Sequence, residues 1–216
     1  MAKVQACSFR LEQEHPSGPV CGLDEVGRGP LAGPVVAACV YVPPELHDLP
    51  FWSAVNDSKK LSATKRDALF EQIMAHSHYG IAECSVEEID SINILQASLL
   101  AMTRALEKMV ANFGHAPALA LVDGNRAPRN MPCQVQTVVK GDSISKSIAA
   151  ASILAKVTRD RQMQMLCEQH PGYGWSSNAG YGTAQHLEGL RNLGLTIHHR
   201  RSFSPIGEME ALLKKA

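Results

Sequence analysis

The sequence has no net charge, no long hydrophobic run and no clustered cysteines, and each absence excludes a class of protein. Its 21 lysines and arginines balance 21 aspartates and glutamates over 216 residues, so no overall field attracts a polyanion, although local basic clusters could bind one. The longest apolar run, residues 35–42, is far shorter than the roughly 20 residues of a membrane helix. The N-terminus also lacks the apolar segment of a signal peptide. We therefore expect a soluble, cytoplasmic protein.

The six cysteines are scattered along the chain, and none has the C-x-x-C spacing of a zinc or redox site. Cysteines in apolar, strand-like runs behave as small hydrophobic residues, and reduced thiols fit a cytosolic compartment. The chain is long enough for one substantial core, and it has no repeat and no clear domain linker. The predicted organisation is a loosely ordered lead-in over 1–18 and one domain over 19–216, which includes a short helical C-terminal extension.

Strand and helix signals together predict an α/β fold, a mixed sheet with helices on both faces. Apolar and β-branched runs indicate five strands, at 20–26, 34–42, 79–85, 119–122 and 135–139. Helical spacing and capping residues indicate helices over 62–76, 91–113, 143–169 and 183–193, and another after Pro205.

Acidic residues stand at the ends of three predicted strands. Asp24 and Glu25 follow the first apolar run, Asp123 the fourth and Asp142 the fifth. Each aspartate could simply cap a turn or a helix. If the strands are neighbours, however, four carboxylates converge where α/β sheets usually hold ligands. Such a cluster repels itself unless it is protonated or neutralised by a cation, and oxygen ligands favour Mg²⁺ or Mn²⁺, two of which can promote phosphodiester hydrolysis.

Two glycine-rich segments have competing interpretations. Residues 27–32 match the dinucleotide pattern G-x-G-x-x-A, but prolines and a β-branched run follow in place of the helix that would hold a pyrophosphate. Residues 141–147 resemble a phosphate-binding loop but lack the glycine before the lysine. The helix that they open could still present Ser143 and Lys146 to a nucleic-acid phosphate.

Other polar residues are weaker candidates. The histidine pairs at 76/78 and 198/199 lack a third suitably spaced ligand, so we expect surface or structural roles for them. Asp160 lies well inside the last long helix and should pair with a neighbouring lysine or arginine. Basic clusters at 140–161 and 198–201 could contact nucleic acid, or each could form an ordinary solvated face.

Seven short segments follow one another along the chain in a characteristic order. They are DEVGRGPLAGPVV from residue 24, NDSKKL from 56, LVDG from 121, VKGD from 139, SIAAASILAKVTRD from 147, GYGT from 180 and HRRSF from 199. In this combination the chain resembles the bacterial ribonuclease HII family, the type 2 ribonucleases H, over about residues 20–206.

The resemblance implies a ribonuclease H-like fold and a metal-dependent endoribonuclease. Its substrates would be RNA–DNA hybrids and duplex DNA with a single embedded ribonucleotide, cut on the 5′ side to leave 5′-phosphate and 3′-hydroxyl ends. By match to the family's motifs, the metal-binding and catalytic set would be Asp24, Glu25, Asp123 and Asp142. The substrate-binding set would be Gly27, Arg28 and Gly29 at the ribose 2′-hydroxyl, Tyr181 on the neighbouring sugar, and Lys59, Ser143 and Lys146 on phosphates. We expect the protein to act as a monomer.

Two other functions are open from the residues. The chain could be a hybrid-binding module that has kept the fold without turnover, or a dinucleotide-dependent enzyme that uses the glycine-rich turn. Four clustered acids would repel the phosphates of a bound nucleic acid, so they favour turnover over binding alone.

Overall fold

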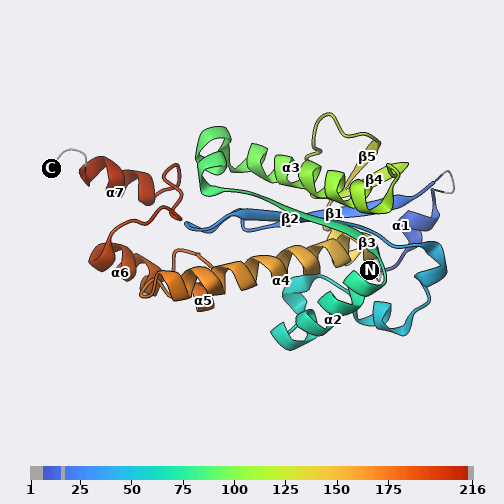
Figure 1. The fold of residues 1–216 in the computed structure, drawn as a ribbon, viewed down its shortest axis with the longest axis horizontal. Coiled ribbons are helices and arrows are strands. Elements are labelled where there is room, and N and C mark those ends of the chain that lie inside the picture. The colour runs from blue at the N-terminus through green and yellow to red at the C-terminus, as the bar shows by residue number, and fades with distance from the viewer. Residues whose placement is uncertain (1–6, 16–17, 214–216) are drawn as a thin grey trace, which may run out of the picture.

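The computed structural model describes residues 7–15 and 18–213, and its centre is a five-stranded sheet of order β3-β2-β1-β4-β5 (Figure 1). The first three strands pair antiparallel, whereas β4 and β5 run parallel to β1. The predicted mixed sheet is confirmed, and every strand lies within one residue of its predicted bounds. The strands are β1 (Val20–Val26), β2 (Val35–Tyr41), β3 (His78–Cys84), β4 (Leu119–Asp123) and β5 (Gln134–Val138).

Helices cover both faces of the sheet, as predicted. α4 (Lys146–Gln169) and α2 (Ala63–Ala75) lie on one face, and α3 (Val86–Phe113) lies on the other (Figure 1). Alternate side chains of β2 point to opposite faces, so this strand contributes to two hydrophobic cores. Val36, Ala38 and Val40 pack in the core under α4, and Val35, Ala37 and Cys39 pack in the core under α3.

The two large helices approach the sheet closely at two glycines. A Cβ on Gly22 of β1 would lie 2.2 Å from the backbone nitrogen of Ile148 in α4. A Cβ on Gly80 of β3 would lie 2.1 Å from the carbonyl oxygen of Ala105 in α3. No real side chain tolerates such contacts, so both helix positions depend on glycine at these two sites.

The helix α3 begins five residues earlier than predicted and is interrupted near its start. Ser85 and Glu88 form a capping box at its N-terminus. Asn93 has non-helical angles (φ 66°, ψ 161°), and its side chain accepts hydrogen bonds from the backbone N–H groups of Leu95 and Gln96. Asn93 therefore acts as a second N-cap, within a stretch where the sequence pattern predicts a single helix.

The helix α4 begins at Lys146, three residues later than predicted. Lys140 has left-handed backbone angles, and Gly141–Ser143 form a 3₁₀ turn, η4, in place of the first helical turn. Ser145 then caps α4. Ser62 caps α2 as predicted, and the connection from β2 to α2 contains three 3₁₀ turns: η1 (Pro44–Leu46), η2 (Pro50–Ala54) and η3 (Ser58–Lys60).

The segment before β1 is folded against the domain over residues 7–15. It contains the short helix α1 (Arg10–Gln13), and the ring of Phe9 stacks on that of His47 with centroids 3.7 Å apart. Glu12 is buried against the start of α4, where one of its carboxylate oxygens accepts three hydrogen bonds. The prediction of a loosely ordered lead-in is therefore wrong for residues 7–15, and for residues 1–6 and 16–17 it lies outside the described residues.

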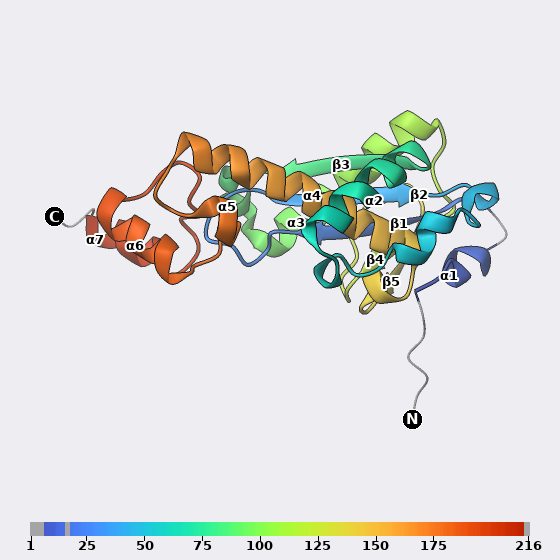
Figure 2. The same ribbon diagram turned by 90° about the horizontal axis from the view of Figure 1, so that it is seen from below.

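The C-terminal extension contains the two predicted helices, α6 (Ala184–Leu193) and α7 (Ile206–Leu213), and also the short helix α5 (Trp175–Asn178), which was not predicted. Figure 2 shows these helices beyond one end of the sheet, next to the C-terminal end of α4. They share a small core with Leu31 and Ala32, which belong to the connection between β1 and β2. In the described part of the chain, no helix is long and apolar enough to cross a membrane.

Candidate active site

The four predicted acids lie at the carboxyl ends of three adjacent parallel strands. The register of β1 with β4 places Asp24 beside Asp123, one step beyond the last paired residues. Glu25 follows Asp24, and Asp142 lies in η4, shortly after β5. Because β1, β4 and β5 are neighbours and run parallel, their ends converge and bring the acids to one edge of the sheet.

Burial and mutual repulsion raise the pKa values of three of these acids. Loss of solvation holds the pKa of Asp24 well above its usual range, and the charges of Glu25 and Asp123 raise it further. Burial also raises the pKa of Glu25, against the lowering effect of Arg28, which pairs with it at 3.2 Å. Burial raises the pKa of Asp142, and neighbouring carboxylates add to the effect. The ionised forms of these three acids are therefore disfavoured at this edge of the sheet.

The donor set of the cluster fits a hard cation. In the present side-chain arrangement, no three of the described His, Cys, Asp and Glu side chains are close enough together to hold a metal ion. All four groups are nevertheless carboxylates under mutual repulsion, which suits Mg²⁺ or Mn²⁺ and not zinc. Their hydrogen-bond donors include the N–H of Gly141 to Asp123 (2.6 Å), the N–H of Glu25 to Asp24 (2.8 Å), the guanidinium of Arg28 to Glu25 (3.2 Å) and the hydroxyl of Ser143 to Asp142 (3.2 Å).

Sequence reasoning missed a fifth acid beside this cluster. Asp57 caps η3 by accepting a hydrogen bond from the N–H of Lys59 at 3.0 Å, and its charge helps to raise the pKa of Asp142. Lys59, a predicted phosphate contact, is exposed, and its positive charge lowers the pKa of Asp142. Both side chains therefore lie within electrostatic range of the acids. The NDSKKL segment was the signal that could have identified Asp57.

The two other predicted phosphate contacts differ in accessibility. Ser143 is half-buried, and its hydroxyl donates to Asp142. Lys146 is only 7% exposed, and its ammonium donates to the carbonyl oxygen of Val55 at 2.6 Å. The structure therefore contradicts the prediction that Lys146 contacts a phosphate, because its charge is buried on the backbone of the preceding loop.

The turn at 27–29 leaves β1 beside Glu25 and lies against Tyr181. Gly27 has a φ of 92°, a conformation that favours glycine. A Cβ on Gly29 would come within 3.2 Å of Cε1 of Tyr181, so the tyrosine ring and the turn are immediate neighbours. The Tyr181 side chain, from the loop before α6, is half exposed. The predicted turn and the predicted tyrosine thus lie together, next to the acids.

The structure gives no support to the dinucleotide interpretation of this turn. The element that follows residues 27–32 is the strand β2, so no helix N-terminus faces the turn. The second glycine-containing segment does lead into a helix, but its Asp142 lies in η4, and Ile144 and the Ser145 cap separate that turn from α4.

Sequence reasoning also missed two buried arginines behind the turn. Arg159 and Arg200 are 1% and 0% exposed, whereas their basic neighbours in the sequence suggested solvated faces or nucleic-acid contacts. His199 is buried as well, and its Nε2 lies 3.1 Å from Nε2 of His186. This contact gives His199 a structural role, one of the two roles that we expected for the 198/199 pair.

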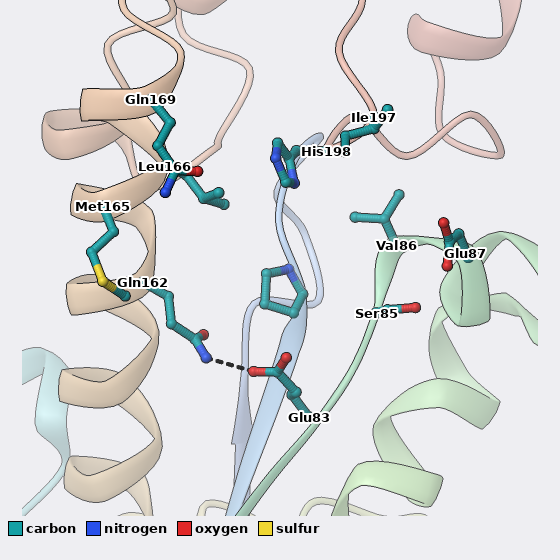
Figure 3. Close-up of a pocket in the computed structure, with 11 residues that line it drawn as sticks. Glu83, Ser85, Val86, Glu87, Gln162, Met165, Leu166, Gln169, Ile197 and His198 are labelled. Carbon is teal, nitrogen blue, oxygen red and sulfur yellow. Dashed lines mark hydrogen bonds between the residues drawn. The ribbon is translucent and has the colours of Figure 1, made fainter.

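A separate pocket opens at the β3 edge of the sheet (Figure 3). Its lining includes Glu83 and Val86 at the junction of β3 and α3, Gln162 and Met165 on α4, and Ile197. Neither the four acids nor residues 27–29 line this pocket. The candidate active site is therefore the acidic edge at β1, β4 and η4, not this pocket.

Comparison with known proteins matches most of the chain to one family. A family model described as Ribonuclease HII matches residues 21–205. Ribonuclease HII of Paramagnetospirillum magneticum is 56% identical over 191 residues, which cover 88% of this chain and 92% of that protein. Ribonuclease HII of Gluconobacter oxydans is 53% identical over 204 residues, which cover 93% and 95%.

Solved structures show the same fold. The crystal structure of ribonuclease H2 from Pyrococcus horikoshii superposes with a TM-score of 0.74 at 25% identity, covering 92% of this chain and all of that one. The structure of a complex between PCNA and RNase HII from Archaeoglobus fulgidus gives a TM-score of 0.67 at 26% identity, covering 86% and 95%. A Bst-RNase HIII solved in complex with Mn²⁺ shares the fold at 20% identity, with a TM-score of 0.71 over 99% of this chain and 72% of that one.

Proposed function

The chain belongs to the ribonuclease HII family, and on this premise we propose that it cleaves the RNA strand of RNA–DNA hybrids and nicks duplex DNA 5′ to a single embedded ribonucleotide. The family makes the protein an endoribonuclease H, a hydrolase of phosphodiester bonds. The products of the proposed reaction carry 5′-phosphate and 3′-hydroxyl ends.

One observation carries the proposal, namely that the self-repelling acids lie beside the glycine turn and Tyr181. We propose that Asp24, Glu25, Asp123 and Asp142 hold two Mg²⁺ or Mn²⁺ ions, which when bound activate a water and stabilise the leaving oxygen. The raised pKa of Asp24 supports this assignment, since a bound cation would relieve the repulsion that Glu25 and Asp123 impose on it. A protein that only bound nucleic acid would gain nothing from this charge.

The remaining groups of the site would bind and orient the substrate. We propose that the backbone of residues 27–29 reads the 2′-hydroxyl, which distinguishes RNA from DNA, and that the Tyr181 ring packs on the neighbouring sugar. The exposed Lys59 and the hydroxyl of Ser143 would contact phosphates beside Asp142. All these groups come from one chain, which supports action as a monomer.

The test is a nicking assay on a DNA duplex that carries one ribonucleotide, with Mg²⁺ or Mn²⁺ and with chelator. We expect a metal-dependent nick 5′ to the ribonucleotide, and Asp123→Asn should abolish the nick while duplex binding is retained. The matched control is Asp160→Asn, because Asp160 is paired with Lys156 at 2.7 Å on α4 and should not affect turnover. If the wild-type protein binds the duplex but does not nick it, the result would contradict the proposal and favour the hypothesis of a hybrid-binding module.

A further inference from the structure

The turn at 27–29 is held from behind by two buried arginines that come from distant parts of the chain. We propose that Arg200 and Arg159 are positioning residues, which fix the peptide groups of the turn so that its free N–H groups face the ribose. This inference rests on the proposed role of the turn as the reader of the 2′-hydroxyl.

The Arg200 guanidinium is fully buried, and among the described residues it donates only to backbone carbonyls of the β1–β2 connection. Two of these carbonyls belong to the turn itself: Nη2 donates to Gly27 at 2.6 Å, and Nη1 donates to Arg28 at 3.0 Å. The same side chain also donates to the carbonyls of Gly33 and Pro34, where β2 is about to begin. One guanidinium thus binds both ends of the connection.

Arg159, on α4, binds the other side of the same connection and joins it to the tyrosine loop. Its Nε and Nη2 donate to the carbonyls of Pro34 and Ala32 at 2.8 and 3.0 Å. Its Nη1 donates to the carbonyl of Ala179, two residues before Tyr181, at 2.8 Å. A Cβ on residue 27 would lie 2.2 Å from Nε of Arg159, so glycine there is required by this packing as well as by its positive φ.

The contacts of Arg200 determine which way the N–H groups of the turn point. A trans peptide is planar, and its C=O and the following N–H point in opposite directions. Because the carbonyls of Gly27 and Arg28 point at Arg200, the N–H groups of Arg28 and Gly29 point away from it. Both residues are exposed, and neither N–H has a hydrogen-bond partner among the described residues. Two parallel donors are therefore available to a ribose oxygen.

The charge of the two arginines has no neutralising ion pair within the described part of the chain. Burial lowers the pKa of Arg200 to about 9 and that of Arg159 to about 10, and the proximity of the two cations adds to the effect on Arg200. A buried cation costs free energy unless its donors are satisfied, and here backbone carbonyls alone satisfy them. Lysine could not replace either side chain, since its compact ammonium cannot span several carbonyls in one plane.

The experiment compares Arg200→Lys and Arg159→Lys with the control Arg104→Lys. Arg104 also donates several hydrogen bonds, but it lies on α3. In an Asp123→Asn background, which prevents cutting, we measure the affinity for an all-DNA duplex and for the same duplex with one ribonucleotide. Each test variant should lower the preference for the ribonucleotide about tenfold, with all-DNA affinity unchanged. In the active background, kcat/KM for nicking should fall about 100-fold. The Arg104→Lys control should stay within about twofold in both measurements.

The possible outcomes separate the two proposals. If the wild-type protein does not nick the ribonucleotide duplex, the proposed function fails and the positioning role fails with it. If the wild type nicks but folded Arg200→Lys and Arg159→Lys keep the preference for the ribonucleotide, only the positioning role is refuted. Equal loss of affinity for both duplexes would also refute it, since that result indicates general structural damage. If Arg200→Lys does not fold, Arg159→Lys decides the question with Arg200 in place.

Discussion

Replacement of Glu12 should destabilise the domain, although this residue lies in a short segment before the first strand. One oxygen of its carboxylate accepts hydrogen bonds from the hydroxyl of Ser145 at 2.6 Å, and from the hydroxyl and the N–H of Ser147 at 2.7 and 2.9 Å. These groups form the N-terminus of α4, where backbone N–H groups lack helical partners and a negative charge is favourable. Glu12→Ala removes the acceptor and the charge together.

The expected cost of Glu12→Ala is about 2 kcal/mol. The N–H of Ser147, left buried without an acceptor, costs about 1–3 kcal/mol, and the lost charge at the helix N-terminus adds about 0.5 kcal/mol. Two effects reduce the total. The hydroxyls of Ser145 and Ser147 lie 3.1 Å apart and can bond to each other, and the second oxygen of Glu12, buried without a partner in the described residues, need no longer be desolvated. For a chain of this size, the melting temperature should fall by about 4–8 °C.

Urea unfolding of three variants measures this cost. Glu12→Gln keeps an acceptor but loses the charge, so we expect a loss of about 1 kcal/mol, between the wild type and Glu12→Ala. Glu14→Ala is the matched control, because the Glu14 side chain forms an exposed pair with Arg10 and its removal should cost less than about 0.5 kcal/mol. A Glu12→Ala variant as stable as Glu14→Ala would refute the reasoning that residues 7–15 support α4.

Three other outcomes follow from individual contacts. Gly22→Ala should lower the free energy of unfolding by about 3 kcal/mol in urea, because its Cβ would meet the backbone of Ile148 at 2.2 Å. Burial lowers the pKa of His199 to about 4, so between about pH 6.5 and 4 the unfolded chain binds more protons than the folded one. As the pH falls through this window, the stability measured by thermal unfolding should therefore decrease, and it should decrease less steeply in His199→Gln. Tyr181→Ala should reduce kcat/KM for nicking about tenfold or more. Tyr181→Phe should change it by less than about threefold, since on our proposal the ring and not the hydroxyl packs on the sugar.

The strands and the acid cluster could be predicted because their signals are local. An apolar, β-branched run identifies each strand, and an acid directly after the run identifies its functional end. The convergence of Asp24 with Asp123 needed only the additional assumption that β1 and β4 are neighbours, which the register of the sheet confirms. The turn follows Asp24 and Glu25 directly in the sequence, so its place beside them was also a local signal. The role of Tyr181 at the same site came from the family resemblance, because no local pattern links two segments about 150 residues apart.

The errors share one cause, which is that burial of a polar side chain depends on partners far away in the sequence. Arg200 and Arg201 are adjacent and chemically identical, yet the first is fully buried and the second exposed. The difference is made by Gly27, 173 positions earlier, whose carbonyl accepts from Arg200. In the same way, the buried Lys146 donates to Val55, 91 positions earlier in the sequence. The buried Glu12 accepts from Ser147, 135 positions later.

On the proposed function, cleavage and recognition of the ribose depend on different parts of this molecule. The acids owe their positions to the parallel register of β1, β4 and β5, which α3 and α4 support from both faces. The turn owes its orientation to Arg200, which follows α6, and to Arg159 on α4, so it depends on the C-terminal extension. A substitution that affects only the acids should therefore reduce turnover while the preference for a ribonucleotide persists. A substitution that affects only the arginines should weaken that preference while leaving the charge cluster, and its affinity for divalent cations, unchanged.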